Sequence, residues 1–179
     1  MHGGPDGRLA NFSAAILTGG AHASAAAAPA ATQKIARLLG ELFQEVLAVG
    51  GGACPEGATR AVPDLSGPEC PLRGVASALA AASGERVLVL AGDGLRVPEP
   101  HADLLLALVA WPEADAVVLR TAHGLEPLCA IYRRDPVLRV ARERLTAGKL
   151  ALHDLLTEVK TRVLDETALP SLDAHRDGR

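Results

Sequence analysis

The sequence predicts an α/β protein: a single domain of three layers (αβα) around a mostly parallel, doubly wound, Rossmann-like sheet. One observation is alternation, because short apolar runs are followed by segments of helical periodicity along the chain. The other is that these runs are continuous instead of alternating with polar residues, which is typical of strands covered on both faces. Together they indicate parallel βαβ units with helices on both sides of the sheet.

Three strands are predicted in the first half of the chain, each a short apolar run closed by glycine. They are residues 13–18, before Gly19-Gly20; residues 46–49, before the glycines at 50–52; and residues 87–91, before Gly92-Asp93-Gly94. Glycine allows the sharp turn that follows such a strand. Residues 53–69 are rich in proline and glycine and are predicted as a loop.

Helices are predicted where apolar residues recur every three or four positions. Residues 32–43 show this spacing, and residues 71–83 begin with a proline, which suits the first turn of a helix. The second half of the chain adds helices at 98–110, 136–146 and 150–159, and strands at 115–120, 127–132 and 162–164. We expect a flexible N-terminal segment over 1–12, the α/β domain over 13–169 and a polar C-terminal tail over 170–179.

Composition narrows the functional classes. The chain has 179 residues, 49% hydrophobic and only 2% aromatic, with a net charge of −3 and no basic run. A nucleic-acid partner is therefore not expected. No apolar run reaches the ~18 residues of a membrane span, and no signal peptide is recognised. The three cysteines match no metal pattern, so we expect reduced thiols in a cytoplasmic protein.

Candidate binding residues follow the predicted strands, because ligands in such sheets bind beyond the carboxyl ends of the strands. Gly19 and Gly20 would let backbone amides approach a phosphate, or would simply form a structural turn. Asp93 could ligate Mg²⁺ against substrate phosphates, or could be a turn aspartate. Neither the Walker motif nor the dinucleotide fingerprint is present.

A second group of candidates lies near residue 70. Asp64 could accept a hydrogen bond from a ribose or a base, or be an ordinary surface aspartate. Arg73 and Gly74, at the start of a predicted helix, could face the same cleft, although Arg73 could equally be a solvated helix charge.

Several stretches resemble one known family when taken in order: "AAILTGG", "LGELFQEVLAV", "VPDLSGPECPLRGVASAL", "RVLVLAGDGL" and "GLEPLCAIYRRDPVL". Over residues 14–164 the chain is similar to the MobA-like nucleotidyltransferases of molybdenum-cofactor biosynthesis, on the glycosyltransferase-A type fold. That family joins GTP to molybdopterin and releases pyrophosphate, and related members use CTP.

The resemblance assigns roles to particular residues. It implies that the nucleotide lies along residues Leu17, Thr18, Gly19 and Gly20, with a further contact from Asp64. It makes Asp93 the catalytic Mg²⁺ ligand. Such chemistry depends on positioning and on neutralising charge at phosphorus.

The chain departs from the family pattern in the opening loop, "LTGGAHASAAAAPAATQK", which lacks the expected arginine and lysine. Lys34 is the nearest lysine and falls inside the predicted helix. Glycines 50–52 stand where the family has an asparagine, and Gly94-Leu95 stands where it has a proline. An inactive or weakly active nucleotide-binding module that docks onto molybdoenzyme maturation proteins is therefore an alternative, and a sugar-1-phosphate nucleotidyltransferase is a third.

Overall fold

The computed structural model describes residues 9–19, 28–50, 54–92 and 111–165. The strands are β1 (Leu9–Leu17), β2 (Phe43–Val49), β3 (Arg60–Val62), β4 (Arg86–Ala91), β5 (Ala116–Thr121), β6 (Gly124–Arg133) and β7 (Thr161–Asp165). The helices of this described part are α1 (Ala28–Leu42), α2 (Pro71–Ala81), α4 (Arg134–Thr146) and α5 (Leu152–Glu158). Within the described residues, no helix is long and apolar enough to cross a membrane.

The strands form one sheet in the order β3-β2-β1-β4-β6-β5-β7. β1 pairs in parallel with β2 and with β4, and β5 pairs in parallel with β7. β6 runs antiparallel to both of its neighbours, β4 and β5. A two-residue connection joins β5 to β6, and so short a turn can join only antiparallel strands. Parallel pairs of strands outnumber antiparallel pairs, so the sheet is mostly parallel, as the sequence predicts.

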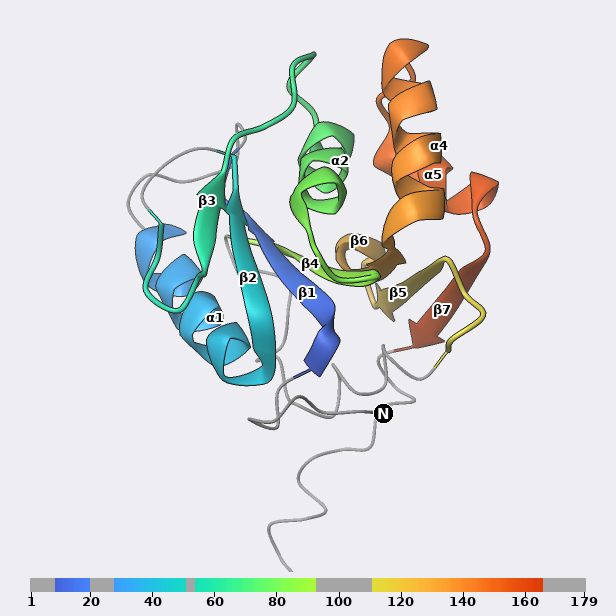
Figure 1. Ribbon diagram of the computed structural model, residues 1–179. Helices are drawn as coiled ribbons and strands as arrows, with labels where there is room; N and C mark the ends of the chain where they lie inside the picture. The colour runs from blue at the N-terminus through green and yellow to red at the C-terminus, as the bar shows by residue number, and fades with distance from the viewer. Residues whose placement is uncertain (1–8, 20–27, 51–53, 93–110, 166–179) are drawn as a thin grey trace, which may run out of the picture.

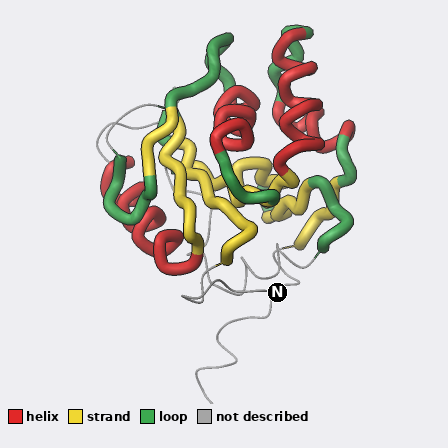
Figure 2. Tube along the Cα trace, in the orientation of Figure 1, coloured by secondary structure: helices red, strands yellow, loops and turns green. Residues whose placement is uncertain are grey.

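Helices cover both faces of the sheet, which gives the three predicted layers (Figures 1 and 2). On one face, Ile35 and Leu39 of α1 pack on Ala14 and Ile16 of β1. On the other face, α2, α4 and α5 share a second apolar cluster that includes Ala15. Neighbouring residues of β1 thus point into different clusters, as the geometry of a strand requires. The fold class is confirmed.

The structure differs from several of the predicted limits, and three differences matter most. β1 begins at Leu9, so residues 9–12 of the segment expected to be flexible belong to the sheet, where Leu9 pairs with Phe43. α1 begins at Ala28, four residues before the predicted start, because alanine favours a helix. The predicted loop 53–69 contains the three-residue strand β3, which is too short to show periodicity. The helix predicted at 98–110 lies outside the described residues.

Candidate functional site

The carboxyl ends of β1, β2 and β4 meet at one edge of the sheet. Leu17 is in register with Val49 on one side and with Ala91 on the other. Pairing continues past the strands, since Thr18 N–H donates to Val49 O at 2.7 Å and Gly92 N–H donates to Leu17 O at 2.9 Å. The loops that follow Leu17 and Gly92 therefore leave the sheet from adjacent points.

Gly19 and Gly50 lie against each other at this edge. A Cβ atom on Gly50 would lie 2.5 Å from Gly19 N, and the φ angle of Gly50 is +117°. A Cβ atom on Gly19 would lie 3.0 Å from Gly50 O. Position 50 therefore needs glycine, and a side chain at position 19 would be tight against the Gly50 backbone, which supports the structural interpretation that the sequence left open. Gly19 is nevertheless exposed.

Thr32 of α1 fixes the end of β4. Its side chain is buried, and its hydroxyl donates a hydrogen bond of 2.8 Å to Gly92 O. A Cβ atom on Gly92 would lie 2.7 Å from Leu17 O and 3.3 Å from Thr32 Oγ1. The N–H of Gly92 is thus hydrogen-bonded to Leu17 of β1, and its carbonyl oxygen is hydrogen-bonded to Thr32 of α1. Sequence analysis did not predict this role, because a threonine near the start of a helix usually indicates a cap.

Asp64 and Arg73 form an ion pair on the α2 side of the same edge. Asp64 follows β3, whose Val62 O accepts a hydrogen bond of 3.1 Å from Gly50 N–H. Arg73 Nη2 lies 3.2 Å from Asp64 Oδ2, and Nη1 donates to Gly67 O at 2.8 Å. The two side chains are only 18% and 22% exposed, so Arg73 is not the solvated helix charge that the sequence left as an alternative.

Ser77 and Gly74 complete the α2 side. Ser77 Oγ accepts a hydrogen bond of 2.9 Å from Leu65 N–H, which ties the loop after β3 to the helix. A Cβ atom on Gly74 would lie 3.1 Å from Leu17 Cδ1, so glycine allows α2 to approach the end of β1. Ser77 was not among the predicted site residues, because only the folded loop brings it beside Asp64.

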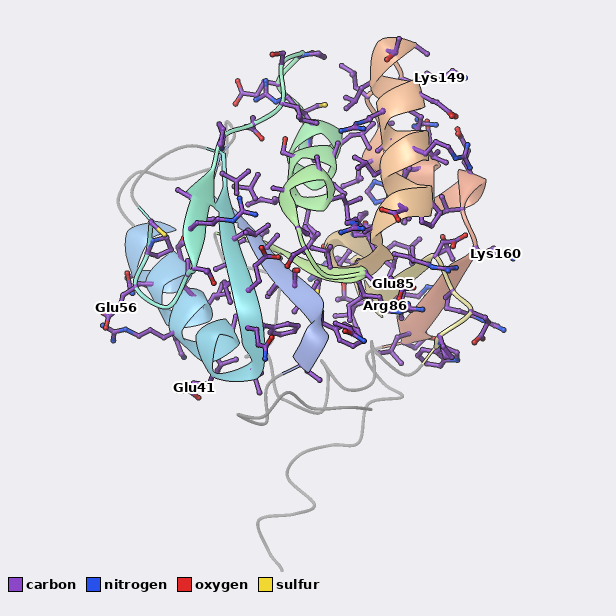
Figure 3. The ribbon with its side chains drawn as sticks, viewed as in Figure 1. Glu41, Glu56, Glu85, Arg86, Lys149 and Lys160 are labelled. Carbon is purple, nitrogen blue, oxygen red and sulfur yellow. The ribbon has the colours of Figure 1, made fainter. Side chains whose placement is uncertain are left out.

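Lys34 lies within α1, as predicted, and its side chain is exposed. It stands two residues after the buried Thr32, and such positions face different sides of a helix. With Arg37 and Glu41 it lines a shallow depression along α1. Figure 3 shows Glu41 on the outer side of this helix, away from the sheet. The role of Lys34 in nucleotide binding therefore stays a prediction.

Two predicted site residues, Gly20 and Asp93, lie outside the described residues. Among the residues that are described, no group of three or more His, Cys, Asp or Glu side chains could hold a metal. The described part of the edge thus supplies backbone groups, the Asp64–Arg73 pair and the Thr18 hydroxyl, which donates to Val49 O at 3.0 Å and so can only accept from a ligand.

Comparison with known proteins gives consistent results. A model of the MobA-like NTP transferase domain matches residues 14–162. A protein of Pelotomaculum thermopropionicum described as "Probable molybdenum cofactor guanylyltransferase" is 31% identical over 144 residues, which cover 78% of this chain and 68% of that protein.

Solved structures share the fold. A crystal structure of a protein from Aquifex aeolicus VF5 superposes with a TM-score of 0.71 at 22% identity, covering 87% of this chain and 86% of that one. Molybdopterin-guanine dinucleotide biosynthesis protein A from Archaeoglobus fulgidus superposes with a TM-score of 0.62 at 18% identity, covering 86% of this chain and 83% of that one.

Proposed function

The chain belongs to the MobA-like NTP transferase domain family, and we propose that it transfers GMP from GTP to molybdopterin with release of pyrophosphate. The family gives the general reaction, which is nucleotidyl transfer from a nucleoside triphosphate. The choice of GTP rests on the Pelotomaculum relative, whose name is that of a guanylyltransferase. CTP is the alternative donor.

One observation supports the location of the site more than any other. The hydrogen bond from Gly92 N–H to Leu17 O joins the ends of β1 and β4. Because of it, the chain leaves β1 after Leu17 and β4 after Gly92 at adjacent points. A nucleoside triphosphate needs such an arrangement, with backbone amides on one side and a carboxylate for a divalent ion on the other.

We assign residue roles on this basis. Leu17, Thr18, Gly19 and Gly20 would lie along the nucleotide, and Asp64 would accept a hydrogen bond from its base or ribose. Asp93 would be the catalytic Mg²⁺ ligand. Mg²⁺ commonly takes one or two protein carboxylates together with substrate phosphates, so the absence of a larger acidic cluster in the described residues is compatible with this role. The ion would neutralise charge that develops at phosphorus.

The alternative is a weakly active or inactive nucleotide-binding module that docks onto molybdoenzyme maturation proteins. Two observations favour it: the opening loop lacks the arginine and lysine of the family pattern, and Arg73 is engaged with Asp64. Loss of such charges commonly costs orders of magnitude in rate.

The proposed location is the cytoplasm. Cys54, Cys70 and Cys129 are free thiols in the structure. Unpaired cysteines suit a reducing compartment.

Turnover tests the proposal. The protein is incubated with GTP or CTP, Mg²⁺ and molybdopterin, and pyrophosphate release is followed for wild type and for Asp93→Ala. Asp135→Ala, a change at an exposed position on α4, is the matched control. We expect release by wild type and by the control, and its loss in Asp93→Ala. No release above background, together with Mg²⁺-independent or absent GTP binding in calorimetry, rejects the enzyme in favour of the accessory module.

A further inference from the structure

The Asp64–Arg73 pair raises a question of charge within the proposed nucleotide site, and the inference drawn from it rests on that proposed function. A carboxylate that contacts the base or ribose lies within about 10 Å of a triphosphate, a distance at which like charges still repel. A neutral acceptor would avoid that repulsion. Asp64 can remain in such a site if its charge is balanced locally.

Arg73 supplies that balance from the first turn of α2. Its guanidinium lies 3.2 Å from Asp64 Oδ2, and both side chains are largely removed from solvent. Because the opposite charges lie so close together, their effects on a more distant anion largely cancel, and the pair acts on it as a nearly neutral unit. The same guanidinium donates to Gly67 O at 2.8 Å, which fixes its orientation.

The second carboxylate oxygen keeps capacity for a ligand. Ser77 Oγ lies 2.7 Å from Arg73 O and 3.3 Å from Asp64 Oδ1. A hydroxyl carries one hydrogen, and the shorter contact takes it. Oδ1 of Asp64 is therefore only weakly engaged, while Oδ2 is held by Arg73. The pair presents one positioned acceptor oxygen.

The ion pair does not have the geometry of the strongest arginine–carboxylate pairs. Arg73 contacts the carboxylate through a single nitrogen, whereas the strong geometry is a bidentate fork. Among the described residues, Arg73 Nε is one of two buried side-chain nitrogens without a hydrogen-bond partner, the other being Arg144 Nε. The single contact leaves the Arg73–Asp64 pair less strongly held than a bidentate pair would be.

We propose that Arg73 is a positioning residue for nucleotide binding: it orients Asp64 and cancels its charge, so that a carboxylate can serve as an acceptor beside a polyanion. Arg73 acts through Asp64 and makes no contact of its own with the reacting phosphates. The competing explanation is that Arg73 only ties the loop after β3 to α2.

The affinity of GTP relative to guanosine separates the two explanations. Calorimetry with Mg²⁺ measures both ligands, with CTP and cytidine in parallel, on wild type, Arg73→Gln, Arg73→Lys and Ser77→Ala. Arg73→Gln removes the charge, Arg73→Lys keeps it, and Ser77→Ala loosens the same loop without changing charge. We expect Arg73→Gln to weaken the binding of GTP by roughly threefold to thirtyfold more than the binding of guanosine. Arg73→Lys and Ser77→Ala should keep the wild-type ratio of GTP affinity to guanosine affinity.

The double variant Asp64→Asn/Arg73→Gln gives a further check, because it removes both charges and should restore the wild-type ratio. If Arg73→Gln does not fold, Asp64→Asn tests the inference instead. It leaves the positive charge of Arg73 without its partner, so the affinity for GTP relative to guanosine should rise. Equal losses for GTP and guanosine in Arg73→Gln, or a ratio in Arg73→Lys that matches Arg73→Gln, overturn the inference. If the wild-type protein binds neither GTP nor CTP, the proposed function is overturned as well. If GTP binding depends on Asp93 but is unaffected by Arg73→Gln, this inference alone is overturned.

Discussion

The Thr32 hydroxyl donates a buried hydrogen bond of 2.8 Å to Gly92 O, which joins α1 to the end of β4. Gly92 N–H is held in turn by Leu17 O at 2.9 Å. The position at which the chain leaves β4 is therefore set by two elements that are distant in the sequence. Asp93, the proposed metal ligand, is the next residue along the chain.

We predict that Thr32→Val destabilises the fold, because it leaves a buried carbonyl without its donor. The expected loss is about 1–3 kcal/mol in the free energy of unfolding, measured by urea denaturation. Thr32→Ser keeps the hydroxyl and should lose less. In the pyrophosphate assay, Thr32→Val should also raise the Mg²⁺ concentration needed for half-maximal rate. A stability equal to wild type would show that the hydrogen bond contributes nothing.

Gly50→Ala should be more damaging than Gly124→Ala, although the two glycines have almost the same φ angles, +117° and +115°. At Gly124 a Cβ atom would meet nothing within 4 Å, so alanine brings only backbone strain of about 1–3 kcal/mol. At Gly50 it would lie 2.5 Å from Gly19 N, and overpacking of this kind adds about 1–3 kcal/mol.

Thermal unfolding of the two alanine variants measures the difference, and the Gly124 variant serves as the control for strain. If both variants melt at the same temperature, the contact between Gly19 and Gly50 is not tight in solution. Gly19 would then have more freedom than its packing against Gly50 indicates.

Sequence patterns predicted most of the architecture because it depends on local periodicity. The buried runs at 46–49 and 87–91 became the central strands β2 and β4, and the proline at 71 did start a helix. The short strand β3 was missed because a strand of three residues is held by its pairing with β2 and not by its own pattern. Residues 9–12 were missed because they directly follow the glycine-rich, polar residues 1–8 and were grouped with them, although three of the four are apolar.

The candidate site was predictable only in part, since it depends on which loops meet at one edge. The parallel sheet placed Leu17, Gly19 and Asp64 at the same edge, as strand polarity requires. The contacts of Thr32 and Ser77 join segments that no local pattern connects. The pairing of Arg73 with Asp64 depends on the path of the intervening loop. The roles of Gly20 and Asp93 stay predictions.

Glu45 makes stability depend on pH at the amino ends of the strands. Burial raises its pKa, but hydrogen bonds from Ser13, Ser83 and Arg60 outweigh this and hold the pKa below its ordinary value of 4.5. Ser13 Oγ donates to the carboxylate at 2.5 Å and Ser83 N–H at 2.8 Å. The stabilisation is therefore complete above about pH 4.5 and is lost as the pH falls through the lower folded-state pKa.

We predict that Glu45→Gln lowers the free energy of unfolding at pH 7 by about 1–3 kcal/mol, and that the gap from wild type narrows on acidification. Urea unfolding at a series of pH values from 7 to about 3 measures this gap. Glu113→Gln, at an exposed position, is the matched control for removal of a negative charge. A gap that stays constant with pH would mean that the Glu45 carboxylate is not the titrating group.

Cys129 should resist alkylation in the native protein, whereas Cys54 should react. Cys54 is exposed, while Cys129 is 2% exposed on β6. Burial, with a smaller contribution from the charge of Glu126, raises the pKa of Cys129 to about 12. At pH 8 only about one Cys129 in ten thousand would be the reactive thiolate. Peptide mass spectrometry after iodoacetamide treatment should show rapid modification of Cys54, and modification of Cys129 only in denaturing urea. Native-state labelling of Cys129 at the rate of Cys54 would show that the pairing of β6 with β4 opens readily.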